Sequence, residues 1–241
     1  DTKLVAAEHG YGALMASLKP TAKLPGKKAA IIGGGPTGIA AAYFLARGGV
    51  ETTIFEREAK LGGVPRYVIP AFRISDEALD KDVALMERLG VEVKCGAPAP
   101  SVEELKKLGY THILMATGAW QAGELGIPGN VKGVIGWMKE MKQQVKPCLE
   151  GHVVVVGAGN TAMDAARVAK RMGAASSTIV YRRTKKEMPA DEHELKLAID
   201  EGVNLVELAA PVEQKDGKLV CSKMQLGEPD ASGRRSPVAT G

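Results

Sequence analysis

Cysteine is scarce in this chain, with only Cys95, Cys148 and Cys221 among 241 residues. They are far apart, and no Cys-x-x-Cys pair or Cys/His cluster occurs. Disulfide frameworks, iron–sulfur clusters and structural zinc sites all need several ligating cysteines at close spacing, so the sequence excludes them within this chain. A reducing, cytoplasmic setting is therefore expected.

Long apolar runs are lacking too. No run approaches the roughly 20 residues that span a bilayer, and the amino terminus has no signal-peptide pattern, so we expect no membrane insertion. Charge is nearly balanced, with 32 Lys and Arg against 28 Asp and Glu and a net charge of +4. This mild excess suits polyanionic small molecules as well as nucleic acid, so it decides little, and no nucleic-acid partner is predicted. The four histidines form no catalytic or metal-binding pattern, so neither kind of site is predicted.

Short apolar runs alternate with helical patterns, which predicts an α/β fold with parallel sheet. The first half has expected strands at 29–32, 52–55, 91–95 and 113–116, and expected helices at 36–47, 75–89 and 101–108. The second half has expected strands at 153–156, 178–181, 204–208 and 218–224, and expected helices at 136–145, 161–172 and 192–201. A short helix is also expected within 11–20.

The segment "GGGPTG" has the spacing of a dinucleotide-binding turn. Gly33 forms the tight turn after a strand, Gly35 lets backbone approach a pyrophosphate, and Gly38 lets the following helix pack closely. Free N–H groups at the helix start favour phosphate binding. Glu56 ends the next strand, where its carboxylate can accept hydrogen bonds from ribose hydroxyls. The alternative is a structural turn with a surface glutamate.

Two further segments indicate that the first nucleotide is FAD. "EREAKLGG" places Gly62 and Gly63 shortly after Glu56, as in the flavoprotein extension of this motif. "THILMATG" is similar to the strand ending in Ala-Thr-Gly of flavoproteins that bind two dinucleotides. A plain β-turn and a buried strand would explain each segment alone, but their order favours FAD.

The segment "VVVVGAGNTAMDAA" repeats the turn with Gly157, Gly159 and Ala162, a variation met at NADP sites. We aligned "TIVYRR" (178–183), at the strand that follows the second turn, with "TIFERE" (53–58), at the strand that follows the first turn. Tyr181 then corresponds to Glu56, and Arg182 and Arg183 come directly after it. Two guanidiniums can bind a 2′-phosphate, which a carboxylate would repel, so NADPH is predicted rather than NADH. The alternative is a solvated basic strand end.

These motifs divide the chain into an N-terminal helix and linker (1–28), an FAD-binding domain (29–128), a connecting segment (129–150) and an NADPH-binding domain (151–241). No catalytic side chain is predicted, because hydride chemistry belongs to the cofactors. The predicted cofactor-binding residues are Gly33, Gly35, Pro36, Thr37, Gly38, Glu56, Arg57, Gly62, Gly63, Ala116, Thr117, Gly118, Gly157, Gly159, Asn160, Thr161, Ala162, Arg182 and Arg183.

The motif set resembles the small (β) subunit family of NADPH-dependent glutamate synthase, which includes the amino-terminal part of dihydropyrimidine dehydrogenase. The resemblance runs from about residue 27 to the end, through "GGGPTGIAAAYFLA", "ILMATGA" and "VYRRTKKEMPADEHEL". Within this family, "IPAFR" and "MQLGEPDASGRRSPV" are most similar to a large iron–sulfur flavoprotein assigned to selenate reductase. The resemblance implies an FAD domain interrupted by an NADPH domain, and electrons that pass from FAD to iron–sulfur clusters.

Two departures from the family pattern stand out. Residues 1–28 lack the cysteine-rich iron–sulfur region, and the chain stops where the return to the FAD domain is expected. We therefore expect a C-terminally incomplete fragment that lacks one wall of the FAD site, with iron–sulfur clusters only in missing or partner regions.

Two functional hypotheses follow. The first is an NADPH-oxidising flavoprotein module that passes electrons to an iron–sulfur domain or a larger catalytic subunit. The second is a nucleotide-binding or docking module without turnover. A thiol–disulfide flavoenzyme is disfavoured because the sequence has no redox cysteine pair.

Overall fold

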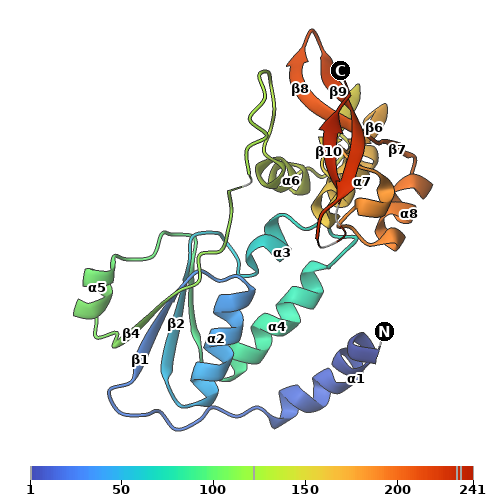
Figure 1. Ribbon diagram of the computed structural model, residues 1–241. Coiled ribbons are helices and arrows are strands. Elements are labelled where there is room, and N and C mark those ends of the chain that lie inside the picture. The colour runs from blue at the N-terminus through green and yellow to red at the C-terminus, as the bar shows by residue number, and fades with distance from the viewer. Residues whose placement is uncertain (1, 122, 232, 234, 241) are drawn as a thin grey trace. The chain divides into compact units, whose positions relative to one another are not determined.

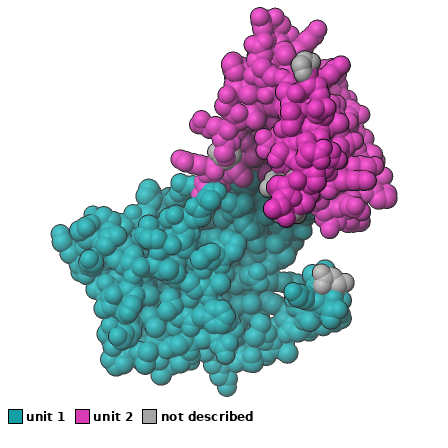
Figure 2. All heavy atoms as spheres, in the orientation of Figure 1, with its two compact units in different colours: residues 1–119 teal, residues 120–241 magenta. Residues whose placement is uncertain are grey.

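The computed structural model describes residues 2–121, 123–231, 233 and 235–240. The chain divides into two compact units, residues 1–119 and 120–241, which Figure 2 colours separately. The domain limits 29–128 and 151–241 remain predictions, and segment 129–150 is part of unit 2. Among the helices in the described residues, none combines the length and the apolarity needed to cross a membrane.

The core of unit 1 is a four-stranded parallel sheet. Its strands are β1 (Lys28–Ile32), β2 (Glu51–Glu56), β3 (Glu92–Cys95) and β4 (His112–Met115), in the spatial order β3-β2-β1-β4. Ile32 pairs with both Phe55 and Met115, so three strands end at the same edge of the sheet. In open α/β sheets, ligands bind at this carboxyl edge.

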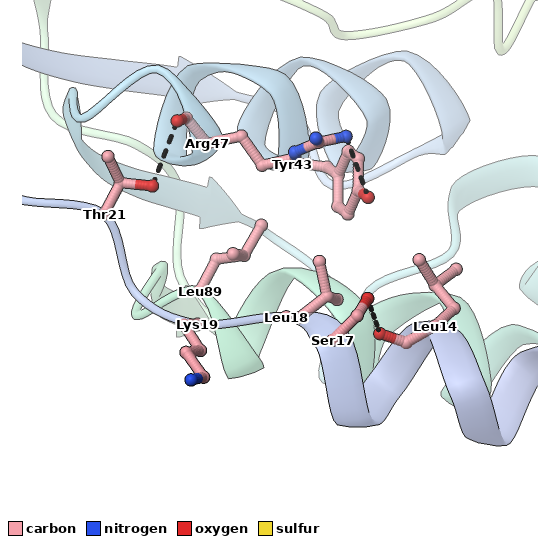
Figure 3. Close-up of a pocket in the computed structure, with 8 residues that line it drawn as sticks. All are labelled: Leu14, Ser17, Leu18, Lys19, Thr21, Tyr43, Arg47 and Leu89. Atoms are coloured by element: carbon pink, nitrogen blue, oxygen red, sulfur yellow. Dashed lines mark hydrogen bonds between the residues drawn. The ribbon is translucent and has the colours of Figure 1, made fainter.

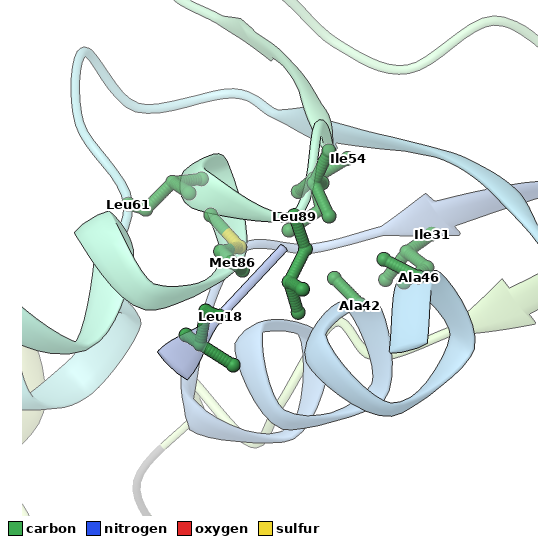
Figure 4. Packing of buried hydrophobic residues seen from close by; sticks show 9 residues of the cluster. Leu18, Ile31, Ala42, Ala46, Ile54, Leu61, Met86 and Leu89 are labelled. Carbon is green, nitrogen blue, oxygen red and sulfur yellow. The ribbon is translucent and has the colours of Figure 1, made fainter. Parts of the chain in front are cut away.

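Helices cover both faces of this sheet (Figure 1). Ile31 and Ile54 pack with α2 (Pro36–Arg47) and α4 (Asp76–Arg88), in the cluster drawn in Figure 4. The neighbouring Ala30 and Phe55 point to the opposite face, where Leu105 of α5 (Val102–Lys107) and Tyr110 cover them. The strands β1 and β2 are therefore covered by apolar packing on both faces, as is typical of parallel sheets.

Two helices of unit 1 differ from the sequence-based expectation. The helix α1 spans Thr2–Ser17, which is longer than the predicted segment within 11–20. The buried Leu18 holds its C-terminal end, and the Tyr11 hydroxyl in its middle donates a hydrogen bond to the carbonyl of Lys81. The helix α3 (Gly63–Tyr67) was not predicted, because five residues are too few for a helical apolar period.

Unit 2 contains a second parallel sheet, in the order β5-β6-β7. The strands are β5 (His152–Val156), β6 (Ser176–Val180) and β7 (Val203–Val206). The helices are α6 (Val134–Lys142), α7 (Asn160–Arg171) and α8 (Glu192–Asp200), with a short 3-10 helix η1 at Lys185–Glu187. Met163 and Ala166 of α7 pack with Ile179 and Ala198 in the core. The second strand–turn–helix unit therefore confirms the predicted repeat of α/β structure.

The C-terminal part of unit 2 is antiparallel. The strands β8 (Ala209–Lys215), β9 (Lys218–Pro229) and β10 (Arg235–Ala239) form a three-stranded sheet in the order β10-β9-β8. Asp216 and Gly217 join β8 to β9, both with positive φ, as a two-residue hairpin turn requires. The sequence predicted only the first part of β9, because β8 and β10 each contain a proline that weakens the strand pattern.

Candidate nucleotide-binding sites

The first glycine turn joins β1 to α2. The amide of Gly33 donates to the carbonyl of Phe55 at 2.9 Å. A Cβ on Gly33 would lie 2.3 Å from the carbonyl oxygen of Ala116, and a Cβ on Gly38 would lie 2.0 Å from that of Gly33. At both positions the backbone packs too closely to admit any side chain, so only glycine fits, as the motif predicts.

Gly35 has a different environment. A Cβ at this position would come no closer than 3.8 Å to its nearest neighbour, the Cα of Gly63. Gly35 is the N-cap of α2 and provides no side-chain cap, and Pro36 and Thr37 after it are exposed. The first amides of the helix thus face space that a side chain would fill, which is the space that an approaching phosphate needs.

Glu56 at the end of β2 is buried and bonded to the turn. Its Oε2 atom accepts a hydrogen bond from the Gly34 amide at 2.6 Å, and its Oε1 atom accepts one from the Glu58 amide at 2.9 Å. A carboxylate oxygen has two lone pairs, so each oxygen retains the capacity to accept a ribose hydroxyl. Glu56 thus joins the turn to the end of the second strand.

Gly34 is a site residue that the motif did not identify. A Cβ on Gly34 would lie 2.2 Å from Cδ2 of Leu61 and 3.1 Å from Oε2 of Glu56. The run of three glycines was the available signal, but nothing in the sequence showed that the middle one faces Leu61.

The predicted flavoprotein extension folds against the first turn. The amide of Gly62 donates to the carbonyl of Gly34 at 2.7 Å, and a Cβ on Gly63 would lie 2.7 Å from the Cα of Gly35. Arg57, in contrast, is exposed, with its Nε atom 3.7 Å from Glu58. The second glycine pair thus forms a wall of the space above Gly35.

The predicted Ala-Thr-Gly segment reaches the same edge of the sheet. The amide of Ala116 donates to the carbonyl of Ile32 at 2.8 Å, next to Gly33, and both Thr117 and Gly118 are exposed. The structure therefore brings together four predicted segments of unit 1, those around Gly33, Glu56, Gly62 and Thr117.

The second glycine turn joins β5 to α7 in the same way. Gly157 has φ +125° and its amide donates to the carbonyl of Val180 at 3.0 Å. Apart from its chain neighbours, no atom of the described residues lies within 4 Å of a Cβ built on Gly159, and Asn160 and Thr161 are exposed. Ala162 is buried, with its Cβ 3.9 Å from a Cβ built on Gly157. The turn thus accommodates a methyl group where the first turn admits only Gly38.

The strand end in unit 2 carries cations in place of an acid. Tyr181 is at the position that corresponds to Glu56 of unit 1. Its hydroxyl donates a hydrogen bond to the carbonyl of Glu187 at 2.8 Å. Arg182 is exposed, whereas Arg183 is only 8% exposed. The Nε atom of Arg183 is buried and has no hydrogen-bond partner among the described residues. An unpaired donor on a buried cation is costly, and an anionic group of a ligand would supply the missing acceptor.

The segment 184–190, which follows these arginines, folds back against the second glycine turn. Thr184 and Glu187 form a capping box around η1, and the Thr184 hydroxyl lowers the pKa of the Glu187 carboxyl by hydrogen bonding to it. The amide of Ala190 then donates to the carbonyl of Ala158 at 3.1 Å. Neither Glu187 nor Ala190 belongs to the glycine motif or to the predicted cofactor-binding residues.

A separate pocket of about 290 Å³ lies in unit 1, between α1 and α2 (Figure 3). It is lined by Leu14, Ser17, Leu18, Lys19, Thr21, Tyr43, Arg47 and Leu89. Tyr43 and Arg47 lie in the last turns of α2, whereas the glycine turn precedes its first residue. The pocket is therefore not part of the candidate nucleotide site.

Comparison with known proteins identifies the family to which these turns correspond. The family described as pyridine nucleotide-disulphide oxidoreductase matches residues 27–230. The protein YgfK of Escherichia coli (strain K12) is 41% identical over 100% of this chain and 24% of its own length. The NADPH-Fe(3+) oxidoreductase subunit beta of Geobacter sulfurreducens (strain DL-1 / KN400) is 40% identical over 88% of this chain and 34% of its own. The chain thus spans about a quarter to a third of these relatives.

The glutamate synthase [NADPH] small chain of Escherichia coli (strain K12) is 34% identical over 95% of this chain and 53% of its own. This match confirms the predicted resemblance. The predicted FAD and NADPH cofactors, and the class of NADPH-dependent flavoprotein oxidoreductases, agree with the family and these relatives.

Solved structures confirm the α/β fold. Lactococcus lactis thioredoxin reductase has a TM-score of 0.54 at 23% identity, over 88% of this chain and 74% of its own. A 2-naphthoyl-CoA reductase has a TM-score of 0.69 at 19% identity, over 93% of this chain and 33% of its own.

Proposed function

Because the chain belongs to the pyridine nucleotide-disulphide oxidoreductase family, we propose that it is an electron-input module of a larger oxidoreductase. In this proposal unit 1 binds FAD, unit 2 binds NADPH, and a hydride passes from the nicotinamide to the flavin. The electrons then leave for an iron–sulfur domain or a larger catalytic subunit. Support for such a partner comes from two relatives that are named as a β subunit and a small chain.

The observation that carries the proposal is the difference between two otherwise similar turns. In unit 1 the second strand ends in a buried carboxylate that is bonded to the turn, Glu56. In unit 2 the corresponding residue is Tyr181, followed by Arg182 and the buried Arg183. A carboxylate favours ribose hydroxyls and repels a phosphate, whereas guanidiniums bind a phosphate. Two different nucleotides explain this difference better than one.

The chain's own residues have binding and orienting roles in this proposal. Backbone amides at the starts of α2 and α7 receive the two pyrophosphates, with room above Gly35 and Gly159. Glu56 accepts from the ribose of FAD, and Arg182 and Arg183 bind the 2′-phosphate of NADPH. Gly62, Gly63, Thr117 and Gly118 provide backbone beside the flavin. The bound cofactors supply the redox chemistry.

Nucleotide titration of the purified 241-residue chain tests the proposal. Quenching of flavin fluorescence measures FAD binding, and calorimetry compares NADPH with NADH. We expect saturable FAD binding and a lower dissociation constant for NADPH than for NADH. Equal constants for the two nicotinamide nucleotides would refute the role of the arginines, and failure to bind FAD would refute the role of unit 1.

A second measurement separates the electron-input module from a docking module. With FAD bound, NADPH is added anaerobically and the flavin absorbance near 450 nm is followed. Bleaching of the flavin band supports hydride transfer within the chain. If both nucleotides bind but the band persists, the chain is a nucleotide-binding module without turnover, which was the alternative.

A further inference from the structure

We propose that Arg66 is a positioning residue for the flavin nucleotide, because it orients the peptide group that holds the second glycine pair against the first turn. The inference rests on the proposed binding of FAD to unit 1. It concerns a side chain that the dinucleotide-binding motif does not include.

Arg66 lies in α3 and is nearly inaccessible, with 4% of the residue exposed. Its Nη2 atom donates to Asp80 at 2.5 Å, and its Nη1 atom lies 3.5 Å from a carboxylate oxygen of Asp76. Both aspartates are in α4. The third group of this guanidinium, Nε–H, donates to the carbonyl of Leu61. The cation is thus held between α4 and a backbone carbonyl of the loop before α3.

The carbonyl of Leu61 and the amide of Gly62 belong to the same peptide group. Arg66 bonds one side of this planar group, and the carbonyl of Gly34 accepts from the other side at 2.7 Å. Rotation of the peptide plane would break both hydrogen bonds. Arg66 therefore fixes the orientation of the peptide that contacts the first glycine turn.

The neighbouring contacts make this arrangement sensitive to small shifts. A Cβ on Gly62 would lie 2.7 Å from the Cβ of Arg66, and a Cβ on Gly63 would lie 2.7 Å from the Cα of Gly35. The two glycine segments and the arginine are thus in close contact, with no room for a side chain between them. Movement of the Leu61–Gly62 peptide would change the width of the space above Gly35.

Core packing alone gives no reason for a cation here. Burial of an arginine is costly unless its donors are paired, and well-packed apolar replacements of buried ion pairs are often neutral in stability. Nη1 makes no hydrogen bond among the described residues. A leucine or methionine would join α3 to α4, but it would not bond the carbonyl of Leu61.

The test compares Arg66→Met and Arg66→Lys with a matched control on α4, Arg88→Met, which removes an exposed cation. For each chain we would measure the FAD dissociation constant, the visible circular dichroism of bound flavin, the NADPH dissociation constant and the thermal midpoint. Amide hydrogen exchange at Gly62, measured without any nucleotide, reports the peptide directly.

In Arg66→Met we expect the FAD dissociation constant to rise about tenfold or more. Losses of this size are typical when a residue that orients the ligand-contacting groups is removed. We also expect an altered flavin dichroism and faster exchange at Gly62, with NADPH binding unchanged. Arg66→Lys keeps the charge without the planar fork, so it should rescue only part of the effect. Arg88→Met should match the unmodified chain in every measurement.

Other outcomes overturn the inference in distinguishable ways. If Arg66→Met lowers only the thermal midpoint, and flavin affinity and dichroism are unchanged well below it, Arg66 merely joins α3 to α4. If Arg66→Met does not fold, Arg66→Lys decides by the same measurements. If the unmodified chain does not bind FAD, the proposed function fails first, and this inference fails with it.

Discussion

The amide nitrogen of Gly62 lies 2.7 Å from the carbonyl oxygen of Gly34, the middle residue of the first glycine turn. Unit 2 has the same relationship, because the amide of Ala190 donates to the carbonyl of Ala158, the middle residue of the second turn. In unit 1 the chain returns after β2 and just before α3, whereas in unit 2 it passes through β6 and η1 before it returns. Each turn is therefore supported by its strand and helix and by a returning segment.

Gly34→Ala is expected to destabilise unit 1, because the new methyl group would overlap the buried side chain of Leu61. Overpacking of this kind costs about 1–3 kcal/mol in the free energy of unfolding. Urea denaturation measures the change. Leu61→Ala removes the overlapping atoms, so the double variant should lose less stability than the sum of the two single variants. Strict additivity would show that Leu61 is not the obstacle.

Gly159→Ala should leave the stability of the fold unchanged but weaken NADPH binding, in contrast to Gly34→Ala. In the part of the chain that the structure describes, no atom beyond the chain neighbours lies within 4 Å of the new Cβ, which would instead occupy the approach to the amides of α7. We expect an unchanged thermal midpoint and an NADPH dissociation constant raised by about tenfold or more. Gly136→Ala, at another open glycine in α6, is the matched control. Full NADPH affinity in Gly159→Ala would place the pyrophosphate elsewhere.

The strands and long helices were predictable because their patterns are local. The helix over 36–47 was predicted with both of its observed ends, since Pro36 starts it and a glycine pair follows it. The helix predicted over 75–89 is observed as Asp76–Arg88, and Ser75 is its N-cap, whose hydroxyl accepts a hydrogen bond from the amide of Ala78. Local sequence signals of this kind require no knowledge of the tertiary structure.

The supports of the two turns were not predictable, because they depend on residues that meet only after folding. Nothing in "KLGGVPRY" shows that Arg66 bonds the carbonyl of Leu61, and nothing in "MPADEHEL" shows that Ala190 reaches Ala158. The sequence also offered no means of distinguishing the two adjacent arginines, yet Arg182 is exposed and Arg183 is buried. That difference comes from the folded surroundings of the strand end.

Glu56→Gln should weaken FAD binding. Both carboxylate oxygens accept from backbone amides, so the NH₂ group of glutamine would face an N–H donor on one side. Since a hydrogen bond to a charged group contributes about 1.5–3 kcal/mol, we expect an FAD dissociation constant raised by roughly tenfold to a hundredfold. NADPH binding should not change. The control is Glu103→Gln, which removes an exposed carboxylate from α5. Unchanged flavin affinity in Glu56→Gln would exclude it as the ribose acid.

Arg182→Ala and Arg183→Ala should both reduce the preference for NADPH over NADH. Each charge-assisted bond to the 2′-phosphate is worth about 1.5–3 kcal/mol, whereas NADH has no phosphate there. Arg183→Ala also removes a buried, unpaired Nε–H, so its thermal midpoint should not fall. Calorimetric titration with both nucleotides measures the preference. Lys218→Ala, an exposed cation in β9, controls for net charge. A preference that survives in both arginine variants would contradict the assignment.

Glu201 links α7 to the end of α8, and its titration should govern the acid stability of unit 2. Hydrogen bonds from Arg171 and Arg167 lower the pKa of its carboxyl from the usual 4.5 to about 2. A carboxyl with a depressed pKa in the folded state stabilises the fold above its unfolded pKa. That stability is lost as pH falls from about 4.5 to about 2.

Glu201→Gln should therefore lower the free energy of unfolding at pH 7 by about 2 kcal/mol, since it removes the carboxylate that accepts hydrogen bonds from the buried Arg167. The same variant should show a weaker loss of stability between pH 4.5 and pH 2 than the unmodified chain does. Chemical denaturation at a series of pH values measures both effects, with the exposed Glu150→Gln as the control. If the variant and the unmodified chain lose stability in parallel over this range, the acid sensitivity of unit 2 arises from other carboxylates, and Glu201 contributes only its packing.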